Sequence, residues 1–331
     1  MKKMKKGLGR FEYYLIQLDD LLLAASRTED PAKYLYVNNA RTVLFMLEGL
    51  SKVYSCLHNR KKFEKLENQF KKLEDLLGAV DYSDCFAKEF QADPAIPSGI
   101  RLYLEDQRDQ KLAELNKVLV KKEWINHDPL RTKKIRRKLK EMDWESGKKE
   151  VEKIADFYKD SIKEIKEFYK STGEAFTDLE NQVHSMRRKL RWLSIYPQAL
   201  QGNIQLAENK EDDDKAVEKY MTPEIVNSPF NKMPNAGTNE FFVLLEKSYF
   251  FALSWMIAEL GKLKDQGLKV MATTEAVQAT EFVVDNIALH RAYELNKMND
   301  GELKNIMSKA KEICSLYFDE KNLDKLIIGA F

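Results

Sequence analysis

Apolar residues recur at three- and four-residue steps along most of this chain, which is the spacing of one face of an α-helix. No segment shows the alternation of apolar and polar residues that is typical of a half-buried strand. The clearest example is a long segment that we expect Ser146 to cap, and its apolar positions are Val151, Ile154, Tyr158, Ile162, Ile165 and Phe168. The pattern therefore predicts an all-α protein built from packed helical bundles.

Capping and breaking residues predict where the helices begin and end. Asp30-Pro31 has the form of a cap followed by proline at the first helical position, and it opens a helix to about residue 57. A second helix is expected over 60–77, with Gly78 as its end. Ser171-x-x-Glu174 resembles a capping box and is expected to open the helix of residues 183–192, which Pro197 bends or ends. Further helices are predicted over 97–120, after Pro129, and over 239–264, 274–297 and 301–318.

At 331 residues the chain is longer than a single core usually supports, so two domains or two repeated halves are expected. Residues 208–238 contain prolines, a glycine and an acidic run, which predicts one long loop. The acidic run at 211–214 lacks the spaced ligands and the glycine turn of a calcium loop, which favours a linker. The division expected is an N-terminal helix over 1–29, a first half over 30–150, a connecting helix over 151–170 and a second half over 171–331.

Charge and cysteine content narrow the kinds of ligand and the cellular location that we expect for this protein. The 55 basic residues nearly balance the 53 acidic ones, so any attraction for a polyanion must be local. The three cysteines are far apart and have no zinc-ligand spacing, which favours a reducing, cytoplasmic location. Acidic residues interrupt the N-terminal apolar segment, which argues against a signal peptide. The longest apolar stretch, 249–258, is too short to span a bilayer, so no membrane association is expected.

The segment VHSMRRKLRW, residues 183–192, gathers basic residues on one side of its predicted helix. At 100° per residue an apolar stripe forms, which consists of Val183, Met186, Leu190 and Leu193. A basic strip lies directly beside it, formed by His184, Arg187, Arg188 and Arg191. Arginine suits bidentate contacts with phosphate oxygens, so the strip fits an anion site. The same pattern also fits a solvated face that pairs with acidic residues of a neighbouring helix.

A second pattern accompanies this helix in each half of the chain. Leu77-Gly78 is expected to close a helix that follows Arg41, and Leu260-Gly261 to close one that follows Arg187. With these motifs the chain resembles the conserved-histidine α-helical domain (CHAD) family. His184-x-x-Arg187 with Arg191, and Leu260-Gly261-x-x-Lys264-Asp265, are similar to the family's two recurring elements. The resemblance implies two similar antiparallel four-helix bundles related by pseudo-two-fold symmetry, with a basic cleft that binds inorganic polyphosphate without catalysis.

The first half departs from the family pattern. Asn38 stands where the histidine is expected, Phe45 and Leu47 occupy positions that should be basic, and Asp81 replaces a cation. Arg41, Glu48 and Lys52 share one predicted face, so charge there is partly neutralised. These departures predict a one-sided polyanion site that is carried mainly by the second half.

Other candidate chemistry is sparse. The basic segment LRTKKIRRKLK (130–140) is interpreted as a solvated helix, with a phosphate-binding flank as the alternative, and it lacks the interleaved aromatic residues that would favour nucleic acid. The remaining histidines are isolated, and the chain contains no catalytic motif. We therefore expect a protein that is not an enzyme and needs no metal or cofactor. The expected polyphosphate site consists of His184, Arg187 and Arg191, with Arg188, Lys264 and Arg41 as additions; the alternative is a helical scaffold or protein-interaction module with no polyanion ligand.

Overall fold

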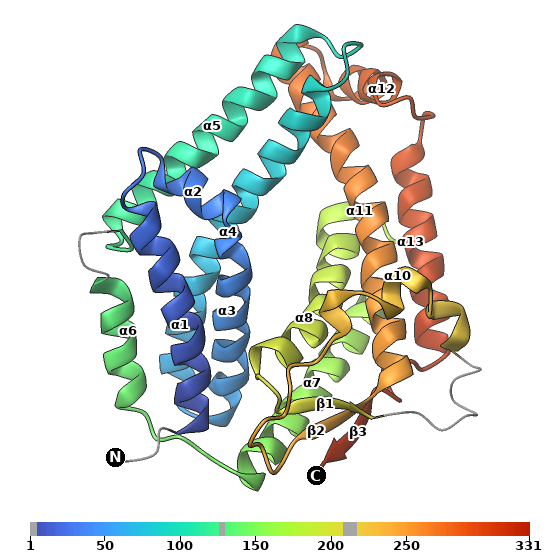
Figure 1. Ribbon diagram of the computed structural model, residues 1–331. Helices are drawn as coiled ribbons and strands as arrows, with labels where there is room; N and C mark the ends of the chain where they lie inside the picture. The colour runs from blue at the N-terminus through green and yellow to red at the C-terminus, as the bar shows by residue number, and fades with distance from the viewer. Residues whose placement is uncertain (1–4, 126–129, 208–216) are drawn as a thin grey trace. The chain divides into compact units, whose positions relative to one another are not determined.

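The computed structural model describes residues 5–125, 130–207 and 217–331, and these residues are predominantly helical (Figure 1). The chain divides into two compact units. The first consists of residues 1–144 and 269–300, and the second of residues 145–268 and 301–331. These limits differ from the expected halves at 30–150 and 171–331, because residues 269–300 pack with the N-terminal segment.

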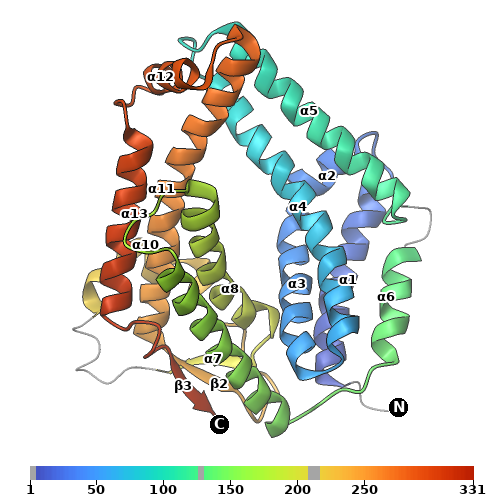
Figure 2. The same cartoon turned by 180° about the vertical axis from the view of Figure 1, so that it is seen from behind.

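The first unit is entirely helical in the part that the structure describes. Helices α3 and α4 lie side by side in Figures 1 and 2, with α1 against α3 and α5 against α4. The end of α11 (Lys247–Glu281) also belongs to this unit. The other helices of the unit are α1 (Lys6–Ala25), α2 (Pro31–Val37), α3 (Ala40–Leu57), α4 (Arg60–Gln91), α5 (Ser98–Lys121), α6 (Leu130–Lys140) and α12 (Asp285–Leu295).

The second unit combines helices with a small sheet. Its long helices are α7 (Lys148–Ser171), α8 (Ser185–Ala199), the first part of α11, and α13 (Glu302–Asp319). Viewed from behind, α7 and β3 lie on the near side (Figure 2). The sheet has the order β1-β2-β3, with β1 parallel and β3 antiparallel to β2. Its strands are β1 (Ile204–Ala207), β2 (Val243–Glu246) and β3 (Ile327–Ala330).

The sheet corrects the expectation of an all-α chain. Each strand has only four residues, which is too short for an alternation of apolar and polar residues to be recognised. The strands that pair with one another are also far apart in the sequence. The expected loop at 208–238 is also partly structured, because its described residues 217–238 form short helices. These helices are η2 (Glu218–Tyr220), α10 (Pro223–Val226) and η3 (Pro229–Asn231).

Two glycines predicted to end helices lie inside them instead. Gly78 is in the middle of α4, and Gly261 is in the middle of α11. In both cases an arginine side chain from another helix occupies the space that a Cβ would need. The glycine therefore marks a close approach between helices, which a sequence pattern cannot distinguish from a helix end.

Several other boundaries can be compared directly. Asp30 caps α2 as predicted, since its carboxylate accepts a hydrogen bond from the Lys33 amide at 3.1 Å. The predicted helix 30–57 is broken at Asn39, which adopts a left-handed conformation with φ of 56°. Ser171 ends α7 and opens no helix. The predicted helix 239–264 begins only at residue 247, because residues 243–246 form β2.

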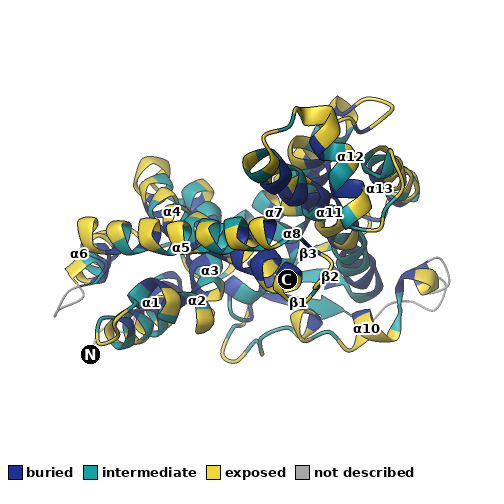
Figure 3. Ribbon diagram, turned by 90° about the horizontal axis from the view of Figure 1, so that it is seen from above, coloured by how far each residue is buried: buried dark blue, intermediate teal, exposed yellow. Residues whose placement is uncertain are grey.

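Buried and exposed residues alternate along the long helices, as expected for helices with one face in a core (Figure 3). The first unit contains an aromatic cluster in which Tyr54, Phe63 and Trp144 surround Phe11, with ring centroids 5.7–5.9 Å from its ring. Gly7 lets α1 approach this cluster, because a Cβ there would lie 2.5 Å from the Trp144 ring. Among the described residues, no helix combines the length and apolarity needed to cross a bilayer.

Candidate functional site: a basic cluster on α8 and α11

The predicted basic helix begins with a π-helical turn, η1 (Leu179–His184), which continues into α8. Asp178 caps this turn, accepting a hydrogen bond from the Asn181 amide at 2.8 Å. This cap replaces the expected one at Ser171. The predicted apolar stripe is confirmed, since its residues Val183, Met186, Leu190 and Leu193 are completely buried. Because π-helical turns are rare and frequently occur at functional sites, His184 at the end of this turn is a candidate functional residue.

His184 is partly buried and contacts one acidic residue. Its Nδ1 lies 2.8 Å from Oε1 of Glu180, one turn earlier. Burial lowers the pKa of His184 below its ordinary 6.5; Glu180 opposes this shift, whereas the positive charges of Lys264 and Arg188 add to it.

Arg187 packs directly against the backbone of α11. Its Nε donates a hydrogen bond to the carbonyl oxygen of Ile257 at 3.2 Å. The same nitrogen lies 3.0 Å from the position that a Cβ on Gly261 would occupy. Gly261 therefore allows the guanidinium group to lie across α11, one turn from Lys264. The sequence pattern contains this glycine but gives no indication of the long-range contact that requires it.

The other predicted site residues differ in exposure. Lys264 is largely buried along its stem, with 16% of its side chain exposed, and its Nζ lies 2.5 Å from Oδ1 of the exposed Asp265. Arg188 is exposed, and Arg191 is partly buried one turn beyond Arg187. Lys189 projects elsewhere, with Nζ 5.1 Å from the centre of the Phe168 ring. The second unit thus brings together His184, Arg187, Arg188 and Lys264, and Arg191 continues the strip along α8.

Arg41 has the same relation to a glycine in the first unit. A Cβ on Gly78 would lie 2.7 Å from Nη2 of Arg41. In this unit, however, two carboxylates hold the guanidinium: Nε donates to Glu74 at 2.6 Å, and Nη1 donates to Asp81 at 3.0 Å. Arg41 therefore lies in a locally neutralised setting.

Glu48 and Lys52 form a second compensated pair in the first unit, as their shared face predicts. Lys52 Nζ lies 2.9 Å from Oε1 of Glu48, and only 2% of the Glu48 side chain is exposed. Burial raises the pKa of Glu48 despite Lys52 and lowers the pKa of Lys52 despite Glu48. Ionisation is thus disfavoured for each partner. Arg41, however, is neutralised from α4 and not by Glu48.

Two basic residues of helix α6, Lys134 and Arg136, form ion pairs with acidic residues outside the helix. Arg136 contacts both Glu12, at 2.9 Å, and Asp19, which attaches α6 to α1. Lys134 contacts Glu123 at 2.6 Å. The Arg131 guanidinium lies 5.3 Å from the centre of the Trp124 ring. These contacts favour the interpretation of α6 as a packed, salt-bridged surface helix.

The described residues contain no group of three or more His, Cys, Asp or Glu side chains that could hold a metal ion. His58 is stacked on Tyr54 with ring centroids 5.5 Å apart, and His290 lies 2.9 Å from Asp300 on the surface. His127 and the acidic run at 211–214 lie outside the described residues. Cys56 and Cys85 are exposed free thiols, and Cys314 is a buried one.

Comparison with known proteins adds no relative from which a function could be transferred. No family model matches the sequence, and no curated protein or solved structure is significantly similar to it. A functional interpretation therefore rests on the residues and their geometry.

Proposed function

We propose that this chain is a non-catalytic, CHAD-like helical protein that binds inorganic polyphosphate or a similar polyanion through its second unit. The site consists of His184, Arg187, Arg188, Arg191 and Lys264. The observation that carries the proposal is the gathering of basic groups from α8 and α11, where the Arg187 guanidinium lies across Gly261, one turn before Lys264. Like charges at this range repel one another, and a bound polyanion relieves that repulsion.

Binding occurs by replacement of counterions. The arginine forks and the lysine contact the non-bridging oxygens of a phosphate chain, and counterions condensed on that chain are released. No bond is formed or broken in the ligand. Because release of counterions drives the association, the affinity falls steeply as the salt concentration rises.

We also propose that the two units derive from an internal repeat with pseudo-two-fold symmetry. The support is local: Arg41 meets Gly78 as Arg187 meets Gly261, each arginine lying across an interior glycine of a long helix. The acceptors of Nε occupy corresponding places, since Glu74 and Ile257 each precede their glycine by one turn. Asp81 then corresponds to Lys264, three residues after each glycine.

This correspondence implies that the two units differ in their capacity to bind a polyanion. The first unit surrounds its arginine with Glu74 and Asp81, whereas the second has a backbone carbonyl and Lys264 at the equivalent places. Arg41 accordingly contributes little to binding. The neutralised first unit is also the observation that favours the alternative function, a helical scaffold that has kept the fold without the ligand.

Titration with long-chain polyphosphate separates these alternatives. The wild-type protein is compared with Arg187→Ala/Arg191→Ala and with a matched control, Lys304→Ala/Lys309→Ala, which removes two exposed positive charges from α13. Loss of two charge-assisted contacts is expected to weaken binding by roughly 100-fold or more, and the control should stay near the wild type. Absence of wild-type binding at about 50 mM salt, where phosphate contacts are strong, would favour the scaffold. Equal weakening in both variants would show that binding has no defined site.

A further inference from the structure

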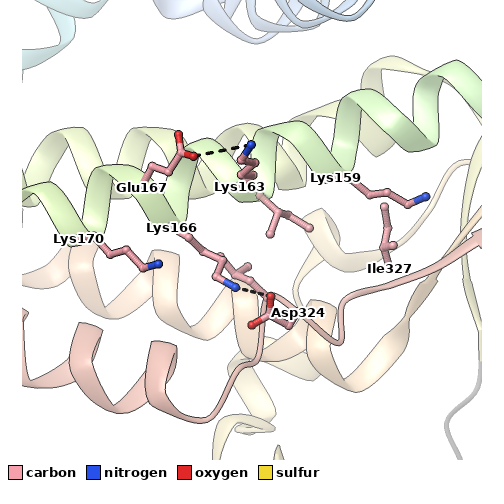
Figure 4. Close-up of a pocket in the computed structure, with 9 residues that line it drawn as sticks. Lys159, Lys163, Lys166, Glu167, Lys170, Asp324 and Ile327 are labelled. Carbon is pink, nitrogen blue, oxygen red and sulfur yellow. Dashed lines mark hydrogen bonds and ion pairs between the residues drawn. The ribbon is translucent and has the colours of Figure 1, made fainter.

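A groove in the second unit lies between α7 and the chain segment that leads into β3. Its volume is about 360 Å³. One wall is α7, and the other is formed by residues of the C-terminal segment, 323–327 (Figure 4). Its lining residues are Lys159, Ile162, Lys163, Lys166, Glu167, Lys170, Leu323, Asp324 and Ile327. None of them belongs to the basic cluster on α8 and α11.

The α7 wall carries a row of lysines. Lys159, Lys163, Lys166 and Lys170 follow one another at four-, three- and four-residue steps, which places them along one side of the helix over about 16 Å (Figure 4). Like charges at these spacings destabilise a helix, so helix formation alone does not favour the row. Only two carboxylates, those of Glu167 and Asp324, line the groove beside these four lysines.

One lysine of the row is paired with a carboxylate of the opposite wall, which is an example of how the lysine row can bind an acidic group. Asp324, from the opposite wall, accepts a hydrogen bond from Lys166 at 2.5 Å. The neighbouring lysines are less engaged, since Lys163 is 3.9 Å from Glu167 and Lys159 is 3.6 Å from Asp156 on their own helix. Within the parts of the chain that the structure describes, no acidic side chain lies within 4.0 Å of Lys170.

The floor of the groove is apolar. Ile162 and Leu323 are buried, with 8% and 2% of their surface exposed, and Ile327 is partly exposed. None of the lining residues is aromatic, so the groove offers no platform for stacking a nucleobase. The row contains no arginine fork to hold phosphate in bidentate contact.

We propose that this groove binds an acidic, amphipathic peptide segment of a partner protein in an extended conformation. Carboxylates on one side of the peptide contact the lysine row, and apolar side chains on the other side contact the partly exposed Ile327. Alternate side chains of an extended chain are about 7 Å apart, and successive lysines of the row are about 4.5–6 Å apart along the helix, so the two spacings are similar. This site is separate from the proposed polyanion site and does not depend on it.

The test measures fluorescence anisotropy of a labelled peptide of alternating Glu and Leu residues. The variant Lys163→Glu/Lys170→Glu reverses two exposed charges of the row, and Lys148→Glu/Lys149→Glu makes the same change on exposed residues of α7 outside the groove. We expect the wild type and the control to bind, and the groove variant to bind at least about tenfold more weakly. A peptide of alternating Lys and Leu should bind the groove variant better than the wild type, which also shows that the variant is folded.

Four further results would overturn the proposal. They are the absence of peptide binding by the wild type, an equal loss in the two charge-reversal variants, equally tight binding of an all-Glu peptide of the same length, and binding of phosphatidylglycerol vesicles in place of the peptide. Arg187→Ala/Arg191→Ala should bind the peptide as the wild type does, and a loss there would show that the two sites are not separate.

Discussion

The guanidinium group of Arg187 lies across the backbone of α11 at Gly261, with Nε 3.0 Å from the position of a Cβ at that residue. Arg41 and Gly78 repeat this relationship in the first unit. Glycine inside a helix costs about 1 kcal/mol relative to alanine, so each glycine needs a compensating contact. The close approach of the arginine supplies it in both units.

Gly261→Ala should therefore weaken polyphosphate binding while leaving the stability of the fold nearly unchanged. The added methyl group forces the Arg187 guanidinium to shift by a few tenths of an ångström and weakens its hydrogen bond to Ile257. The better helix propensity of alanine offsets this loss by about 1 kcal/mol, so thermal unfolding should change little. Polyphosphate affinity should fall about tenfold, because the displaced arginine loses its alignment. Calorimetric titration and thermal melting measure the two effects.

Gly78→Ala is the matched control in the other unit. Its methyl group would lie 2.7 Å from Nη2 of Arg41 and so displaces this side chain in the same manner. Because Glu74 and Asp81 neutralise Arg41, polyphosphate affinity should remain within about twofold of the wild type. If Gly261→Ala binds as tightly as Gly78→Ala, the placement of Arg187 is irrelevant to binding.

Exchange of the charges three residues after each glycine gives a second prediction. Lys264→Asp places a carboxylate beside His184 and Arg187 and should weaken polyphosphate binding by more than about tenfold. Asp81→Lys removes one partner of Arg41 and adds a cation to the first unit, so binding should strengthen. The slope of affinity against salt concentration should become shallower for Lys264→Asp and steeper for Asp81→Lys. The opposite order of slopes would contradict the assigned roles of the two units.

The sequence predicted the helical character and the buried stripe of α8 because both depend on local periodicity. Its failures occur where a distant contact overrides a local signal. Gly78 and Gly261 read as helix ends, but an arginine from another helix explains them. The strands have only four residues each, so their periodicity is too short to recognise. They are stabilised by pairing with strands that are distant in the sequence.

The sequence placed the basic residues of α8 beside its buried stripe, as the structure has them, whereas it assigned the compensation of Arg41 to the wrong partner. Once α4 is treated as one continuous helix, Glu74, Gly78 and Asp81 fall at four- and three-residue steps on a single face. That spacing is the signal that would have identified the two carboxylates around Arg41. The cap at Asp178 was missed because Ser171 offered a more familiar motif.

The buried pair in the first unit gives a third prediction, for Glu48→Gln. Burial raises the folded-state pKa of Glu48 above 4.5, so its contribution to stability is present at low pH and is lost as the pH rises through that folded value. Glutamine keeps an acceptor for Lys52 and does not ionise. The substitution should therefore favour the folded protein more at about pH 7 than at about pH 4.5, which urea unfolding of both proteins at each pH measures. If the stability gained by Glu48→Gln relative to the wild type instead grows as the pH falls, the raised pKa of Glu48 is contradicted.

His184 gives the last prediction, since its pKa is lowered chiefly by burial, with Lys264 and Arg188 adding to the effect and Glu180 opposing it. In the free protein its stabilising contribution is present above pH 6.5 and is lost as the pH falls, because the unfolded chain then binds the proton more readily. A bound polyanion reverses this preference by favouring the charged ring. Polyphosphate affinity should therefore continue to rise as the pH falls below 6.5, and His184→Gln should flatten this rise. His290→Gln, a change at a histidine that is 59% exposed in the first unit, should keep the wild-type dependence. If His184→Gln and His290→Gln give the same pH profile, His184 does not contact the bound polyanion.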